Sequence, residues 1–166
     1  KIWVIPASRM KAEKEHRVPL TRSCIGILEN LPDRSDSPYV FAAVRGGQLS
    51  DATVGKLLRS IHVLELSKGN VGFVDNQQDG RVVVPHGFRS TFREWAAEST
   101  SYPREVIEHC IAHQLKDRSE AAYQRSTILP KRIKLMALYD EFCSRVLGQS
   151  KLNDVRPIRA AMPENN

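Results

Sequence analysis

A phosphate-binding pair, a second imidazole and a phenol stand within one stretch of this basic chain. His86 and Arg89 are three residues apart, so on a helix both would project from one face of the same turn. His113 directly follows an apolar segment that is predicted to be helical, and Tyr123 comes ten residues after it in a short polar segment. A guanidinium and an imidazole can hold a phosphate while a phenol attacks it. These groups are the parts that phosphoryl transfer through a tyrosine nucleophile requires.

Each of these residues also has a purely structural interpretation. His86 could be a histidine at the start of a helix, with Arg89 solvated beside it. His113 could be a structural, hydrogen-bonded histidine at a helix C-terminus, where the helix dipole favours it. Tyr123 could pack as an amphipathic surface residue. The functional interpretation is favoured because the groups occur together, whereas Tyr139 lies on the apolar stripe of the last predicted helix and is rejected as a nucleophile.

A metal site is not expected. His109 and His113 are four residues apart and could hold zinc from one helix face. However, no glutamate takes the zincin position beside His109, and no third ligand is evident. The chemistry is therefore expected to need neither a metal nor another cofactor.

The chain has the length of one domain and an excess of basic residues. Its 166 residues can bury a single core, and its formal net charge of +6 favours an acidic partner. No apolar run is long enough to span a membrane and no signal peptide is visible, so a soluble, cytoplasmic protein is predicted. Three widely separated cysteines, Cys24, Cys110 and Cys143, are predicted to be reduced core residues.

The hydrophobic pattern predicts a short hairpin followed mainly by helices. Residues 1–6 and 16–20 are expected to be strands joined by a charged turn. Thr21 can cap a first helix, and Ser50 can cap a second helix with an apolar inner face. The apolar set of that second helix is Val54, Leu57, Leu58 and Ile61.

Three more helices are predicted in the second half of the chain. They cover residues 86–98, residues 103–112, where Pro103 suits the first turn, and residues 130–148. Residues 149–166 are polar without periodicity and are predicted to be a disordered tail. The first of these helices has one stripe with Phe88, Phe92 and Trp95 and another with His86, Arg89 and Arg93.

Three short motifs follow one another in a fixed order. They are His86-Gly87-Phe88-Arg89-Ser90-Thr91-Phe92, Ile111-Ala112-His113 and Ala121-Ala122-Tyr123. With the hairpin segments 3–11 and 16–20, they resemble the tyrosine recombinase family, specifically the integrases of phages and genomic islands. The resemblance extends from about residue 1 to about residue 147. Lys11 lies seven residues before Val18, which is where that family carries its catalytic lysine. Lys14 in the same charged turn is a close competitor, and lysines in such turns are usually just solvated.

The resemblance implies both a fold and an activity. The fold would be α+β, mainly α-helical, like a tyrosine recombinase catalytic domain with its small N-terminal β-hairpin, over residues 1–148. The activity would be site-specific DNA recombination, in which phage or genomic-island DNA is integrated or excised through a 3′-phosphotyrosine. The partners would be double-stranded DNA attachment sites and other protomers in a synaptic tetramer, in a bacterial cytoplasm at the nucleoid and away from any membrane.

The resemblance also implies a role for each site residue. Tyr123 would attack the scissile phosphate and release a 5′-hydroxyl. Arg89 would clamp the non-bridging oxygens and stabilise the pentacoordinate transition state. His86 would help to manage the tyrosine proton, His113 would donate to a phosphate oxygen, and Lys11 would protonate the leaving 5′-oxygen.

One feature of the family has no counterpart in this chain. The family's active site uses two arginines, the first on a helix before the hairpin, whereas this sequence begins at Lys1 inside a predicted strand. Arg9 and Arg34 do not fit that position, because they lie in the hairpin and in a loop. We therefore expect a C-terminal fragment that cleaves little DNA alone. The alternative functions are cleavage-inactive DNA binding and DNA relaxation like that of a type IB topoisomerase.

Overall fold

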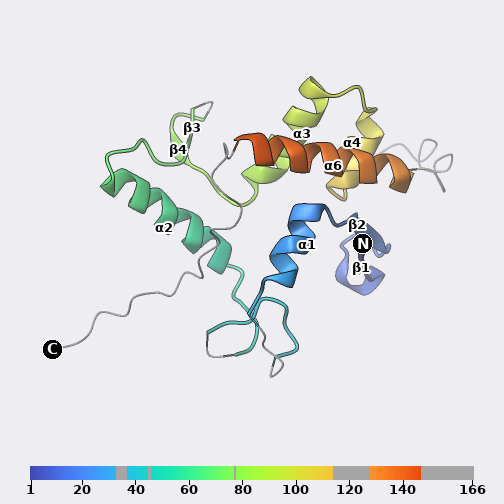
Figure 1. Ribbon diagram of the computed structural model, residues 1–166, viewed down its shortest axis with the longest axis horizontal. Helices are drawn as coiled ribbons and strands as arrows, with labels where there is room; N and C mark the ends of the chain where they lie inside the picture. Colours follow the sequence, from blue (N-terminus) through green and yellow to red (C-terminus); the bar gives the residue numbers. More distant parts are fainter. Residues whose placement is uncertain (33–36, 45, 77, 114–127, 147–166) are drawn as a thin grey trace.

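The computed structural model describes residues 1–32, 37–44, 46–76, 78–113 and 128–146 and is mainly helical (Figure 1). The predicted fold class, α+β with mainly α-helix and a small N-terminal hairpin, is confirmed. No helix within these residues is long and apolar enough to cross a membrane. The elements are β1 (Ile2–Ile5), η1 (Ala7–Arg9), β2 (His16–Pro19), α1 (Arg22–Glu29), α2 (Thr53–Ser67), β3 (Val74–Asp75), β4 (Arg81–Val82), α3 (Gly87–Ser99), α4 (Arg104–Cys110) and α6 (Ile128–Val146).

The N-terminal hairpin forms where the sequence predicts it. β1 and β2 pair antiparallel, with Trp3 opposite Val18, as expected for strands rich in β-branched and aromatic residues. The charged connection between them begins with the 3₁₀ turn η1. β2 also packs against α6, so the position of the hairpin depends on that helix.

A small core lies where α3, α4 and α6 meet (Figure 1). Tyr139 of α6 meets Phe92 of α3 edge to face, with ring centroids 5.0 Å apart, and Trp95 lies 4.9 Å from Tyr139. Phe88, which the sequence places on the same stripe, is 55% exposed, so the buried stripe of α3 begins one turn later. The buried hydrophobic residues are Phe92, Ala96, Val106, Ile107 and Leu135.

Helix α2 differs from the prediction in two ways. None of its residues is buried, and Val54 of the predicted inner face is 53% exposed. The reason is that α2 does not pack extensively against any other element in the described part of the chain. Its N-cap is Ala52 rather than Ser50, whose hydroxyl instead bonds the Thr53 hydroxyl at 3.1 Å, because residues 51–52 form a turn before the helix.

The cysteines are less buried than the sequence predicts. Cys24 is exposed, whereas Cys110 and Cys143 are half-buried, and all three are free thiols. Cys24 is exposed because α1 contributes no buried residue to the core. The prediction of a core position is therefore wrong for Cys24.

The last helix begins two residues before the predicted start, at Ile128. Its predicted end at Gly148 and the predicted tail over residues 149–166 lie outside the described residues. The domain boundary at residue 148 therefore stays a prediction.

Helix α6 caps the start of α1. The Thr21 hydroxyl accepts from the Cys24 backbone N–H at 3.3 Å, as the sequence predicts for an N-cap. The same hydroxyl donates to Asp140 Oδ1 at 2.9 Å, and the Ser23 N–H donates to Asp140 Oδ2 at 3.3 Å. A carboxylate of α6 therefore sits at the positive end of the α1 dipole and ties the two helices together.

We expect Asp140→Ala to lower the free energy of unfolding by about 1–2 kcal/mol, because it removes a helix cap and a charge at the helix N-terminus. The neighbouring Glu141→Ala removes only an exposed ion pair to Arg145 and should cost less than about 0.5 kcal/mol. Urea unfolding of the two variants tests the cap. Equal losses would show that Asp140 does not stabilise α1 in this way.

Candidate active site

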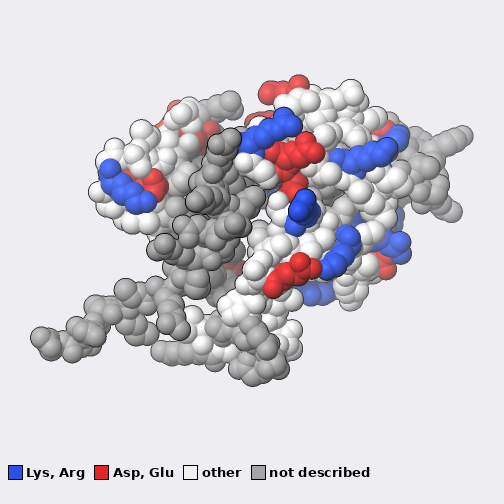
Figure 2. All heavy atoms as spheres, viewed as in Figure 1, with Lys and Arg blue, Asp and Glu red and all other residues white. Residues whose placement is uncertain are grey.

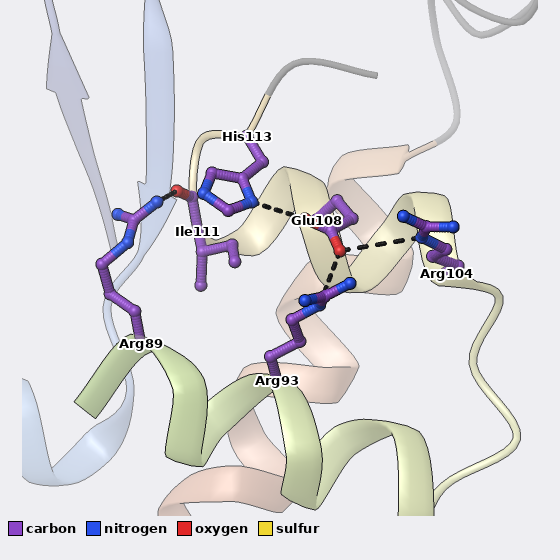
Figure 3. Close-up of polar contacts among 6 residues, drawn as sticks. All are labelled: Arg89, Arg93, Arg104, Glu108, Ile111 and His113. Carbon is purple, nitrogen blue, oxygen red and sulfur yellow. Dashed lines mark hydrogen bonds and ion pairs between the residues drawn. The ribbon is translucent and has the colours of Figure 1, made fainter. Parts of the chain in front are cut away.

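The end of α4 is a tight turn that brings two predicted site residues together. The His113 N–H donates to the Glu108 carbonyl at 2.9 Å, and the Ala112 N–H donates to the His109 carbonyl at 3.3 Å. This pair of bonds is a Schellman motif, which requires a left-handed residue after the helix, and Ala112 has φ +54°. The turn directs the chain back so that the His113 side chain lies over the helix that precedes it (Figure 3).

Arg89 of α3 contacts the same turn. Its Nη2 donates to the Ile111 carbonyl at 2.6 Å, and the side chain is half-buried. Figure 3 shows the Arg89 guanidinium and the His113 imidazole on either side of this carbonyl. The structure therefore brings Arg89 and His113 together, although they stand 24 residues apart in the sequence.

A buried carboxylate lies beneath His113. Glu108 is only 4% exposed, and its Oε2 accepts from His113 Nδ1 at 2.6 Å. Arg93 Nε lies 2.8 Å from Oε1, and Arg104 Nε lies 3.8 Å from the same oxygen (Figure 3). Neither arginine meets Oε1 in hydrogen-bonding geometry, so both act on it as ion pairs.

The pKa of Glu108 is held below its ordinary value. Burial acts to raise this pKa, but the hydrogen bond from His113 and the charge of Arg93 outweigh burial, with a smaller effect of Arg104. The side chain is therefore a carboxylate at neutral pH. A carboxylate has no proton to donate, so Nδ1 of His113 is the donor in the bond between them.

The side chains of two other predicted site residues, His86 and Lys11, are not joined to this cluster. His86 is the exposed residue before α3, and its carbonyl accepts from the Arg89 N–H at 3.1 Å. Lys11 is exposed in the connection between η1 and β2, and its side chain makes no hydrogen bond or ion pair with any described residue. Tyr123 lies outside the described residues.

A second polar cluster lies between α6 and the hairpin. Arg132 is only 6% exposed, and its Nη2 donates to the Arg17 carbonyl at 2.6 Å. The same nitrogen is 3.4 Å from His16 Nε2, whereas Nε is buried without a hydrogen-bond partner. No carboxylate of the described residues pairs with this arginine, so it is a buried cation without a counterion there.

Burial and this cation together lower the pKa values of two histidines. Burial lowers the pKa of His16, and the charge of Arg132 lowers it further. Burial also lowers the pKa of His109, again with Arg132, against a partial opposing effect of Glu105. Arginine can only donate, so its contact with His16 Nε2 agrees with a neutral imidazole that accepts there.

Tyr139, rejected as a nucleophile from the sequence, has an environment unsuited to ionisation. Burial in the aromatic cluster, together with Cys143, raises its pKa to about 12. A phenol with a raised pKa is harder to convert to the attacking phenolate.

Sequence reasoning missed Glu108 and Arg132. Glu108 directly follows the apolar pair Val106 and Ile107, and an acidic residue beside such a pair is itself a signal. Arg132 gave no comparable signal, because its partners are more than a hundred residues away in the sequence. Among the residues that the structure describes, no three potential ligands gather as a metal site.

One face of the molecule carries both basic and acidic side chains. In Figure 2, Lys and Arg side chains are interspersed with Asp and Glu over the described part of this face. Local groups such as Arg89 and His113 and the overall charge of +6 can both attract an anion.

The two neutral histidines predict how stability depends on pH. The folded pKa values of His16 and His109 lie below the unfolded value of 6.5, so on acidification the unfolded chain takes up protons first. The free energy of unfolding should therefore decrease as the pH falls below 6.5. Urea unfolding between about pH 8 and pH 5 measures this slope. His16→Gln combined with His109→Gln should flatten it, whereas an unchanged slope would contradict the interpretation, and His86→Gln at an exposed site is the control.

The left-handed residue at the end of α4 predicts a stabilising substitution. Ala112→Gly should raise the free energy of unfolding by up to about 1 kcal/mol, because glycine adopts positive φ without a Cβ clash. Ala137→Gly, on the exposed side of α6, should instead lower it by about 1 kcal/mol. Thermal unfolding of both variants tests whether Ala112 is strained by its positive φ. A decrease in the free energy of unfolding for Ala112→Gly as large as that for Ala137→Gly would contradict this interpretation.

The sequence was compared with known proteins. Residues 1–128 match the Phage integrase family. "Prophage integrase IntA" of Escherichia coli (strain K12) is 31% identical over 137 residues, which are 81% of this chain and 29% of that protein. "Prophage integrase IntZ" of the same organism is 28% identical over 146 residues, which are 87% of this chain and 32% of that protein. No solved structure matches the chain.

These matches agree with the motifs and with the hairpin-and-helix fold. The chain spans about three tenths of the length of the curated relatives it matches. The family match covers the hairpin, the turn at the end of α4 and the predicted nucleophile. The chain therefore belongs to the phage integrase family, whose members are tyrosine recombinases.

Proposed function

We propose that the chain carries the DNA-cleaving centre of a site-specific recombinase. In this proposal, Tyr123 attacks the scissile phosphate and forms a 3′-phosphotyrosine, and the released 5′-hydroxyl later reverses the step on a new strand. The observation that carries the proposal is the convergence of Arg89 and His113 on the turn at Ile111. Membership of the family supports a phosphate-binding role for these two residues.

The bonds that hold Arg89 and His113 leave both side chains able to bind an anion. Arg89 has five N–H donors and uses one nitrogen to bond the Ile111 carbonyl, so the rest of its planar fork is available for a phosphate. His113 uses Nδ1 to bond Glu108, which leaves Nε2 for an oxygen of the substrate. Two preorganised donors at one turn can stabilise the charge that develops on a pentacoordinate phosphorus.

The remaining roles follow from chemistry and position in the sequence. His86 stands one helical turn before Arg89 and helps to remove the Tyr123 proton. Lys11 is on the exposed connection of the hairpin and protonates the leaving 5′-oxygen. The phosphotyrosine bond conserves the energy of the phosphodiester, so the exchange needs neither ATP nor a metal.

The proposed partners are those that membership of the family suggests. The substrate is double-stranded DNA with attachment sites, and recombination takes place in a synaptic tetramer in the cytoplasm of a bacterial host. The net charge of +6 supports binding to a polyanion, and this contribution weakens as salt rises.

We expect Tyr123→Phe to abolish covalent attachment to a nicked suicide DNA while leaving DNA binding intact, because phenylalanine has no attacking oxygen. The assay uses the complete polypeptide that contains these residues, since the relatives are about three times longer than the matched region. Denaturing gels detect the adduct, and filter binding measures affinity.

Tyr139→Phe is the matched control and should keep the adduct. Attachment that persists in Tyr123→Phe, or that maps to Tyr139, would contradict the assignment. Relaxation of supercoiled DNA without a requirement for two attachment sites would favour a topoisomerase instead.

A further inference from the structure

Glu108 has a chemical environment that core packing alone does not explain. It is a carboxylate with 4% exposure, flanked in the sequence by an apolar residue of the core, Ile107. Burying a carboxylate costs several kcal/mol unless it is paired, and an apolar residue of similar size would avoid that cost. The side chain instead gathers a histidine and two arginines around it (Figure 3).

The three partners of Glu108 are not equivalent. His113 has the shortest contact, 2.6 Å to Oε2, and Arg93 of α3 lies 2.8 Å from Oε1. Arg104 lies 3.8 Å away with a side chain that is 79% exposed, so it contributes little. Arg132, the buried arginine of α6, makes no ion pair with Glu108 and bonds the Arg17 carbonyl instead. Glu108 therefore faces mainly His113 on one oxygen and Arg93 on the other.

We propose that Glu108 is a positioning residue for His113 in DNA cleavage. Its carboxylate accepts from Nδ1–H, which fixes the plane of the imidazole and leaves Nε2 pointing away from the helix. A ring held in this way presents Nε2 to a non-bridging phosphate oxygen, to which an Nε2–H donates when both ring nitrogens carry protons. Arg93 holds the carboxylate in place from the second helix. This inference rests on the proposed function.

The same residue links His113 to Arg89. Arg89 and Arg93 are four residues apart, on one face of α3. When Arg93 pairs with Glu108, that face of α3 lies against the end of α4, where Arg89 reaches the Ile111 carbonyl. The carboxylate therefore positions one phosphate ligand directly and supports the other through the helix.

The test is a double-mutant cycle on the rate of cleavage of nicked suicide DNA by the complete polypeptide. Glu108→Gln keeps the shape of the side chain and removes its charge, and it should slow cleavage by about tenfold to a hundredfold. In the His113→Ala background the same substitution should cause no further loss, because Glu108 acts through His113. Glu105→Gln, one turn earlier on the same helix, is the matched control and should cleave like the unmodified protein.

A separate measurement keeps the inference testable if Glu108→Gln folds poorly. Nitrogen-15 NMR of the histidine rings in the unmodified protein should show Nδ1 of His113 protonated and hydrogen-bonded. In folded Glu108→Gln, the Nδ1–H signal should lose the downfield shift of a charge-assisted hydrogen bond, because an amide oxygen replaces the carboxylate oxygen.

The outcomes separate this inference from the proposed function. No adduct from the unmodified protein would contradict the proposed function. Normal cleavage by Glu108→Gln, an equal loss with and without His113, or an unprotonated Nδ1 would overturn the positioning role while leaving the proposed function in place.

Discussion

The pairing of one buried carboxylate with cations from two segments constrains the candidate site. Glu108 needs positive charge close to both of its oxygens, because an isolated carboxylate at this depth would lose its hydration without compensation. Arg93 and His113 supply that charge. Arg93 shares a helix face with Arg89, so its ion pair with Glu108 holds that face against the end of α4, where Arg89 bonds the Ile111 carbonyl. Two groups that could bind phosphate are thereby held in place by a residue that need not touch the substrate.

The hairpin is held to the helices by a buried cation rather than by a buried carboxylate. Arg132 is a buried cation that has carbonyl and imidazole partners but no carboxylate within the described residues. Its bond to the Arg17 carbonyl attaches β2 to α6, and β2 follows directly after the connection that carries Lys11. Burial and the charge of Arg132 lower the pKa values of His16 and His109. The attachment of the hairpin to α6 is therefore sensitive to the protonation of these two histidines. The charge of Glu108, in contrast, is balanced by the cations around it.

Membership of the phage integrase family and the contacts at the end of α4 contribute different information. The motifs that resemble those of the family predict Arg89 and His113 as site residues by their types and spacing. They do not explain why an imidazole at the end of a short helix should have a defined orientation. The Schellman turn at Ala112 and the carboxylate of Glu108 give that orientation a cause, since one directs the backbone and the other holds the ring.

By itself, the sequence determined the features that are encoded within a few neighbouring residues. The hairpin strands, the cap at Thr21, the helix after His86 and the order of the motifs all follow from local propensity, periodicity and spacing. The tertiary structure decided which faces are buried. The apolar stripe of α2 and the thiol of Cys24 are uncovered because no described element packs closely over them, although their patterns resemble those of core residues. Glu108 and Arg132 depend even more on the fold, because the energy of a buried charge is set by partners that only folding brings near. The sequence around Glu108 and Arg132 does not indicate those partners, which are Arg93 on another helix and Arg17 on a distant strand.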